Sequence, residues 1–122
     1  MKKLDLKINL EKYTRIDQCP VRNVISRFSG KWSMLVLCVL SENDSIRFNE
    51  ICKAIPDISP KVLTETLKNL ESAGLVSRQL YAEIPPRVEY SLTDTGTSLM
   101  PHIENLINWA LENYGSIAKS DN

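Results

Sequence analysis

Residues 58–74 constrain the fold of this chain most, because they predict one helix with a marked start and a marked end. Ser59 has a hydroxyl of the kind that caps a helix N-terminus, and Pro60 follows at the position where a helix needs no N–H. Gly74 can take the left-handed conformation that closes a helix in a Schellman motif. At helical spacing, the apolar face consists of Leu63, Leu67 and Leu70, and the polar face of Lys61, Thr64, Glu65 and Lys68. Such a helix either is an ordinary surface helix or presents its polar face to a partner, and the flanking segments must decide.

Three further helices are predicted before this segment. Pro20 suits the first position of a helix, with Cys19 as its N-cap, and an apolar stripe follows that consists of Val21, Val24, Ile25 and Phe28. Residues 31–40 are apolar almost all round, which is typical of the most buried helix of a domain. Residues 48–55 repeat apolar side chains at i, i+3, i+4 and i+7, and only three residues join them to the helix that starts at Ser59. Two short helices joined so closely predict a helix-turn-helix, although generic helical hairpins use similar turns.

A β-hairpin and a last helix are predicted after it. Residues 76–81 and 87–92 have strand character, and the loop between them is stiffened by Pro85 and Pro86. Residues 46–47 predict a very short additional strand. Thr93 and Asp94 can cap a helix that runs to about residue 114, with a kink or break expected before Pro101. We therefore expect a mainly α fold with a small β-hairpin, which is a winged helix-turn-helix.

Composition sets bounds on the rest. At 122 residues the chain is most simply one domain, and its 43% apolar and 25% charged residues are typical of a globular protein. The formal net charge of zero gives no overall support for nucleic-acid binding, although residues 1–93 hold 14 Lys and Arg against 11 Asp and Glu. Three cysteines and the single His102 lack metal-ligand spacing, so we expect neither a metal site nor a cofactor. Without an apolar leader or a membrane-length apolar run, the sequence predicts a cytoplasmic protein.

The first 18 residues differ in pattern from the remainder. Four apolar residues alternate with polar ones, which favours a half-buried strand or a dimer contact; they are Leu4, Leu6, Ile8 and Leu10. A loosely ordered terminus is the open alternative. We therefore divide the chain into an arm at 1–18, a compact domain at 19–114 and a flexible tail at 115–122.

Six blocks of residues follow one another in a recognisable order. They are Cys19-Pro20-Val21, Gly30-Lys31-Trp32, residues 47–51 (RFNEI), residues 58–63 (ISPKVL), residues 70–76 (LESAGLV) and residues 85–93 (PPRVEYSLT). In this order they resemble the HxlR family of small winged-helix transcription regulators. The resemblance covers residues 19–114 and implies a homodimer that is held by its terminal helices. It further implies that this dimer binds double-stranded operator DNA with two recognition helices and two wings.

The resemblance and the polar face of the capped helix together nominate a DNA-binding set. A helix fits the major groove, where polar side chains meet base edges and phosphates. The candidate residues are Lys31, Arg47, Asn49, Ser59, Lys61, Thr64, Glu65, Lys68 and Arg87. Arg87, beside the wing tip, is expected to reach a flanking minor groove. The alternative is that Lys61 and Glu65 form an i, i+4 surface pair and that the other polar residues only solvate the helix.

Cys19 is a candidate redox sensor. A thiol at a helix N-terminus, three residues from Arg22, is placed where dipole and charge favour the thiolate. Some HxlR members sense oxidants or electrophiles with a cysteine in this position, and the resemblance transfers that role to Cys19 alone. The alternative is an N-cap of ordinary reactivity.

The last helix carries more apolar residues than one small domain needs, so we expect it to form the dimer interface. The candidate interface residues are Leu99, Ile103, Leu106, Ile107, Trp109, Ala110, Leu111 and Tyr114. The predicted function is that of a homodimeric, sequence-specific transcription regulator that binds a pseudo-palindromic operator and responds to redox state or electrophiles through Cys19. The alternative is a winged-helix protein-interaction module without specific DNA binding. No nucleophile–base pair, metal motif or phosphate loop indicates an enzyme.

Overall fold

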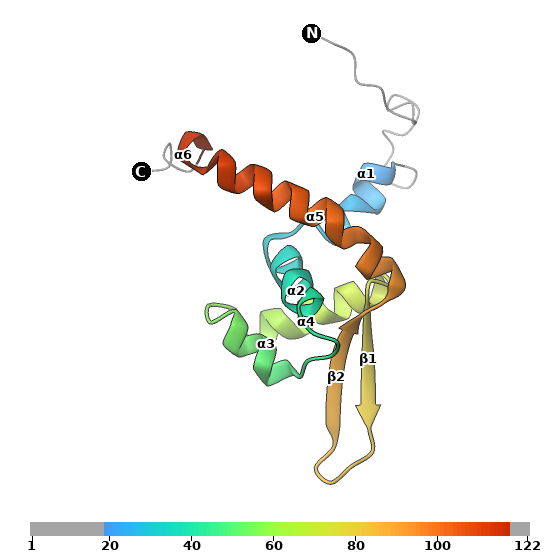
Figure 1. The fold of residues 1–122 in the computed structure, drawn as a ribbon. Coiled ribbons are helices and arrows are strands. Elements are labelled where there is room, and N and C mark those ends of the chain that lie inside the picture. Colours follow the sequence, from blue (N-terminus) through green and yellow to red (C-terminus); the bar gives the residue numbers. More distant parts are fainter. Residues whose placement is uncertain (1–18, 118–122) are drawn as a thin grey trace.

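The computed structural model of the chain describes residues 19–117, so the predicted arm at 1–18 and residues 118–122 of the predicted tail lie outside the described residues. In this part the elements follow in the order α1 (Pro20–Asn23), η1 (Ile25–Arg27, a 3-10 helix), α2 (Lys31–Ser41), α3 (Phe48–Ala54), α4 (Pro60–Ser72), β1 (Val76–Tyr81), β2 (Arg87–Leu92), α5 (Asp94–Glu112) and α6 (Tyr114–Ile117). The strands project from one side of the helical body, and α5 runs across the opposite side (Figure 1). This is the predicted mainly helical fold with one antiparallel hairpin.

The caps that were predicted for α4 are present at both ends. The Val62 N–H donates to the Ser59 hydroxyl oxygen at 3.1 Å, and Pro60 is the first helical residue. Gly74 has a φ of 79°, and the Leu75 N–H donates to the Leu70 carbonyl at 3.0 Å, which is the long bond of a Schellman motif. The start and end of α4 are therefore encoded by a few local residues.

The hairpin has the predicted bounds, and its register places alternate residues on two faces. Val76 pairs with Leu92, Arg78 with Tyr90, and Leu80 with Val88. Ile46 forms a β-bridge to Tyr90, with N–O distances of 2.9 and 2.8 Å in the two directions. The short strand predicted at 46–47 is thus reduced to one residue, because Arg47 already caps α3.

The core lies between α2, α4, α5 and the base of the hairpin. Its buried side chains are Val36, Leu37, Leu40, Ile46, Ile51, Ile55, Ile58, Leu63, Leu67, Leu70, Leu75, Val76, Met100 and Ile103. α2 contacts α3, α4, α5 and β2, but it is not buried all round, because Leu35 is 44% exposed. The apolar character of α2 thus exceeds what the core of one protomer uses.

One expectation about helix continuity was wrong, and one of the two alternatives for another is excluded. The stripe predicted after Pro20 does not form one helix, because α1 ends at Asn23 and a 3-10 turn follows; Val21, Val24 and Ile25 remain exposed. These β-branched residues gain little helix stability unless they pack, and residues 19–117 give them little to pack against. In contrast, α5 is continuous across Pro101, where a break had been one of the two expectations.

No single helix within residues 19–117 is long and apolar enough to cross a membrane, whereas residues 21–27 and 31–41, bent by 55° from each other, reach that length and composition only together.

Candidate nucleic-acid interface

The polar face of α4 is open to solvent along its length. Lys61, Thr64, Glu65 and Lys68 are all exposed, and the leucines on the opposite face are fully or nearly fully buried. Lys61 and Glu65 form no ion pair with each other within 4.0 Å, and neither of them forms one with any other described residue. The surface-pair alternative therefore finds no support in this geometry. The Thr64 hydroxyl donates to the Pro60 carbonyl at 2.8 Å, so its oxygen retains acceptor capacity toward solvent.

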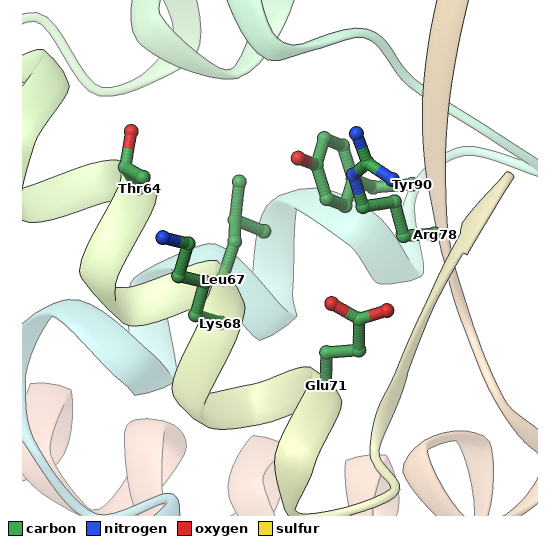
Figure 2. A pocket seen from close by; sticks show the side chains of 6 residues that line it. All are labelled: Thr64, Leu67, Lys68, Glu71, Arg78 and Tyr90. Carbon is green, nitrogen blue, oxygen red and sulfur yellow. The ribbon is translucent and has the colours of Figure 1, made fainter. Parts of the chain in front are cut away.

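A notch separates α4 from the hairpin. It has a volume of about 280 Å³ and is lined by Thr64, Leu67, Lys68, Glu71, Arg78 and Tyr90. Figure 2 shows the side chains of Lys68 and Glu71 rising from α4 opposite Arg78 and Tyr90 of the hairpin. The notch therefore brings two cations to the edge of the polar face of α4.

Arg78 is the functional candidate that the sequence analysis missed. It pairs with Tyr90 across the hairpin and so lies on the face that packs toward α4, yet it is exposed and makes no ion pair with any described residue. The signal was available, because Arg78 interrupts an apolar face between Val76 and Leu80. A cation at such a position needs a partner or solvent, and here solvent reaches it beside α4.

Arg87 is not free at the wing. Its Nη1 atom lies 2.8 Å from Glu83 Oε1, and its Nε atom lies 2.8 Å from Glu89 Oε2. The guanidinium carbon is 4.0 Å from the centre of the Tyr81 ring. The Nε–H is not aligned with Glu89 for a hydrogen bond, so that contact is an ion pair. The expectation that Arg87 extends into a minor groove therefore competes with three contacts inside the wing.

The remaining DNA candidates lie at helix starts. Lys31 is exposed at the start of α2, with its Nζ atom 4.4 Å from the centre of the Trp32 ring. Arg47 and Asn49 are exposed at the start of α3, where the Arg47 backbone N–H donates to Glu50 Oε1 at 3.2 Å. Ser59 is exposed and its hydroxyl is used as the cap of α4. These side chains face solvent at helix N-termini, where an anion is favoured.

All three cysteines are free, and they differ in environment. Cys19 is 7% exposed and directly precedes α1, which has only four residues. Cys38 and Cys52 pack against the core, as predicted, and are partly exposed. Burial, followed by the charges of Glu42 and Glu104, raises the pKa of Cys38 above its ordinary value.

The interface candidates on α5 and α6 divide into three groups by exposure. Five of them are exposed: Leu106 (56%), Trp109 (55%), Ala110, Leu111 (69%) and Tyr114 (67%). Leu99 and Ile107 are half-buried against the core. Ile103 is 0% exposed and belongs to the core of the protomer, so it offers no side-chain surface to a partner and we correct its assignment.

Among residues 19–117 no three His, Cys, Asp or Glu side chains are grouped so that they could hold a metal ion.

Comparison with known proteins assigns the family. The HxlR-like helix-turn-helix pattern matches residues 27–118. An uncharacterised HTH-type transcriptional regulator of Methanothermobacter thermautotrophicus is 46% identical over 98 residues, which cover 80% of this chain and 73% of that protein. The regulator YkvN of Bacillus subtilis is 48% identical over 80 residues, 66% of this chain and 67% of YkvN.

Two solved redox-related structures are also similar. The redox regulator HypR in its reduced form superposes with a TM-score of 0.75 at 33% identity, covering 82% of this chain and 98% of HypR. Diamide-treated YodB from B. subtilis superposes with a TM-score of 0.64 at 39% identity, covering 71% of this chain and 85% of YodB. These proteins share the winged helix-turn-helix fold described above. The chain belongs to the HxlR-like helix-turn-helix family and is an HTH-type transcriptional regulator, not an enzyme.

Proposed function

We propose that this regulator binds a pseudo-palindromic operator as a homodimer and places α4 of each protomer in a major groove. The observation that carries the proposal is the polar face of α4, which is exposed, unpaired along Lys61 and Glu65 among the described residues, and bordered by Lys68 and Arg78 at the notch. A helix in the major groove reads bases, and cations beside it neutralise phosphates. Half-site centres about 34 Å apart, or a multiple, are expected for such a dimer.

The salt dependence of binding tests this assignment. Each phosphate contact contributes about 0.9 to the slope of log K against log salt, and a dimer carries every lysine twice. Lys61→Gln or Lys68→Gln should therefore lower the slope by about 1.8, which is roughly a twelvefold smaller affinity loss between 50 and 200 mM salt.

The measurement is fluorescence anisotropy with a duplex selected from a random-sequence pool by the wild-type protein. Arg22→Gln is the charge-matched control, because Arg22 is exposed on α1, outside α4 and the notch. Unchanged affinity and slope in both lysine variants would refute the proposed role of α4. A wild-type protein that selects no duplex at low salt but captures a specific protein would favour an interaction module.

For the dimer, the support is the apolar surface of α5 and α6. Leu106, Trp109, Leu111 and Tyr114 are each more than half exposed in the protomer, an unusual density of apolar surface for one helical end. Leu111→Glu should lower the molar mass measured by light scattering from dimer to monomer. Leu80→Glu, at a 54% exposed position on the hairpin, is the control and should remain dimeric. A Leu111→Glu dimer would contradict this interface.

For the signal, we propose that Cys19 makes operator binding sensitive to oxidants. The support is its place directly before α1 and the similarity to HypR, a redox regulator, and to YodB in a diamide-treated form. Diamide should change the operator affinity of the wild type and of Cys52→Ser, but not that of Cys19→Ser. An equal response in Cys19→Ser would refute the role of Cys19.

A further inference from the structure

A series of side-chain contacts begins at the tip of the wing, which is the β1–β2 hairpin with its loop, and ends at a residue outside the hairpin. Glu83 pairs with Arg87, and Arg87 pairs with Glu89, each at 2.8 Å. The second carboxylate oxygen of Glu89 then accepts a hydrogen bond from the Ser45 hydroxyl at 2.6 Å. Ser45 belongs to the loop before α3, so the chain joins the wing to the helix-turn-helix.

The backbone supports this chain of contacts. Tyr81 and Arg87 are cross-strand partners at the end of the hairpin, so the ring and the guanidinium that lies 4.0 Å from its centre are on the same face. Two residues along β2, Glu89 lies on that face too. Next to Ser45, Ile46 exchanges two backbone hydrogen bonds with Tyr90. Side chains and backbone therefore hold the same two segments together.

The burial of these groups distinguishes them from ordinary surface ion pairs. The side chains of Arg87 and Glu89 are 25% and 20% exposed, whereas Glu83 at the tip is 49% exposed. Exposed pairs contribute little because water screens them, and partial burial reduces that screening. The Arg87–Glu89 ion pair is thus the least screened of these contacts and should contribute most to holding the wing in place.

The charges of Glu83, Arg87 and Glu89 are not explained by contact with DNA. A wing that approaches phosphates carries two carboxylates, Glu83 and Glu89, and each would repel DNA. Arg87 lies between them, so most of its attraction is directed inward. A structural role accounts for all three charges, whereas a phosphate contact accounts for Arg87 alone.

We propose that Arg87 and Glu89 are positioning residues, which fix the wing against the loop before α3 so that wing and recognition helix meet DNA in one geometry. The proposal rests on the DNA binding proposed above. It replaces the expectation that Arg87 itself reaches into a minor groove. Arg87 is suited to this role because its extended planar guanidinium donates a hydrogen bond to Glu83, forms an ion pair with Glu89 and lies over the Tyr81 ring at the same time, whereas lysine offers a single point charge.

The direction in which Glu89→Gln changes DNA affinity distinguishes a positioning role from a purely electrostatic one. Glu89→Gln removes a negative charge from a DNA-facing element, so electrostatics alone predicts tighter binding. Positioning predicts weaker binding, by about five- to tenfold, the net scale of one ordinary hydrogen bond. Ser45→Ala should weaken binding in the same direction without changing charge, and Arg87→Lys should behave like Glu89→Gln. Glu71→Gln is the charge control and should bind slightly tighter, because Glu71 is exposed in the notch and forms no ion pair with any residue in the described part of the chain.

Hydrogen–deuterium exchange of the free protein supplies a readout that needs no DNA. Exchange at residues 79–89 should be faster in Glu89→Gln and Ser45→Ala than in the wild type, with α4 unchanged. Shortening the operator duplex at both ends removes the flanking DNA that the wing is proposed to contact. This should lower the affinity of these variants less than that of the wild type, because their wings already contribute less to binding. Tighter binding by Glu89→Gln, or unchanged exchange in the wing, would overturn the inference while leaving the proposed function intact. Failure of the wild type to bind any duplex would instead refute the proposed function.

Discussion

Gly96 lies at the joint between α4 and α5, and Gly96→Ala should destabilise the protein strongly. The Thr93 N–H donates to the Leu75 carbonyl at 3.1 Å, and the Thr93 hydroxyl donates to the Gly74 carbonyl at 2.7 Å. These bonds draw the first turn of α5 onto the Schellman turn of α4. A Cβ at Gly96 would lie less than 3.0 Å from the Leu75 carbonyl oxygen, and 3.2 Å from Leu92 Cδ2.

Opposing effects set the magnitude. Alanine favours a helix interior over glycine by about 1 kcal/mol. Overpacking of a tight site costs about 1–3 kcal/mol, and the upper end applies here because a backbone oxygen cannot rotate away. Separation of the two elements also weakens the two Thr93 bonds, at about 1 kcal/mol each. The net destabilisation is about 2–3 kcal/mol, which lowers the melting temperature of a domain of this size by at least about 8 °C.

Urea unfolding at one fixed protein concentration measures this change, since the stability of the proposed dimer would depend on concentration. Gly115→Ala is the matched control, because a Cβ at Gly115 in α6 has no atom within 4 Å. The control should be neutral or stabilised by up to about 1 kcal/mol. A Gly96→Ala protein as stable as the wild type would refute the claim that this joint tolerates only glycine.

Further expected outcomes concern a cap and a thiol. Ser59→Ala removes the acceptor for the Val62 N–H and should lower the unfolding free energy by about 1 kcal/mol in urea; an unchanged midpoint would show that the cap contributes nothing. Because burial and two carboxylates raise the pKa of Cys38, iodoacetamide should alkylate it more slowly in the folded protein than in urea at a pH of about 8–9. The folded state then binds more protons than the unfolded state, so the contribution of Cys38 to stability falls as pH rises through the ordinary thiol range, and Cys38→Ala should show a smaller alkaline loss in the same urea assay. Equal alkylation rates, or an identical alkaline loss, would contradict the shifted pKa.

The elements that the sequence predicted well are those that local residues encode. The start of α4 needs only Ser59 and Pro60, its end needs only Gly74, and both strands have the predicted bounds. Turns and caps depend on residues a few positions apart, so their signals survive without tertiary information.

The segment that began at Cys19 shows where local patterns fail. Its apolar stripe indicated a helix through Phe28, but apolar spacing stabilises a helix only where a surface accepts the stripe. The described protomer provides little such surface, and the helix stops at Asn23. For the same reason the apolar residues of α5 could not be divided in advance into Ile103, which the core takes, and Leu106 or Leu111, which it leaves exposed.

The sequence predicted which polar residues the candidate site contains, but not which other residues they contact. The exposed polar face of α4 follows from helical spacing, whereas the engagement of Arg87 depends on Glu83 and Glu89 being brought to it by the hairpin. The Ser45–Glu89 bond joins residues 44 positions apart, and no local signal encodes such a pair. Arg78 was missed because strand character alone does not show that its side chain lies beside α4, where the hairpin brings it.

Two long-range contacts would therefore set the geometry in which α4 meets DNA under the proposed function. One ties the wing to the loop before α3 through Glu89, and the other ties the end of α4 to the start of α5 through Thr93 and Gly96. The first fixes the wing relative to the helix-turn-helix within a protomer. In a dimer joined through α5, the second fixes how far apart the two recognition helices lie. A small change at the wing contact should then alter affinity for the sequence that flanks each half-site, whereas a small change at the α4–α5 joint should alter the preferred half-site spacing and leave the bases read within each half-site unchanged.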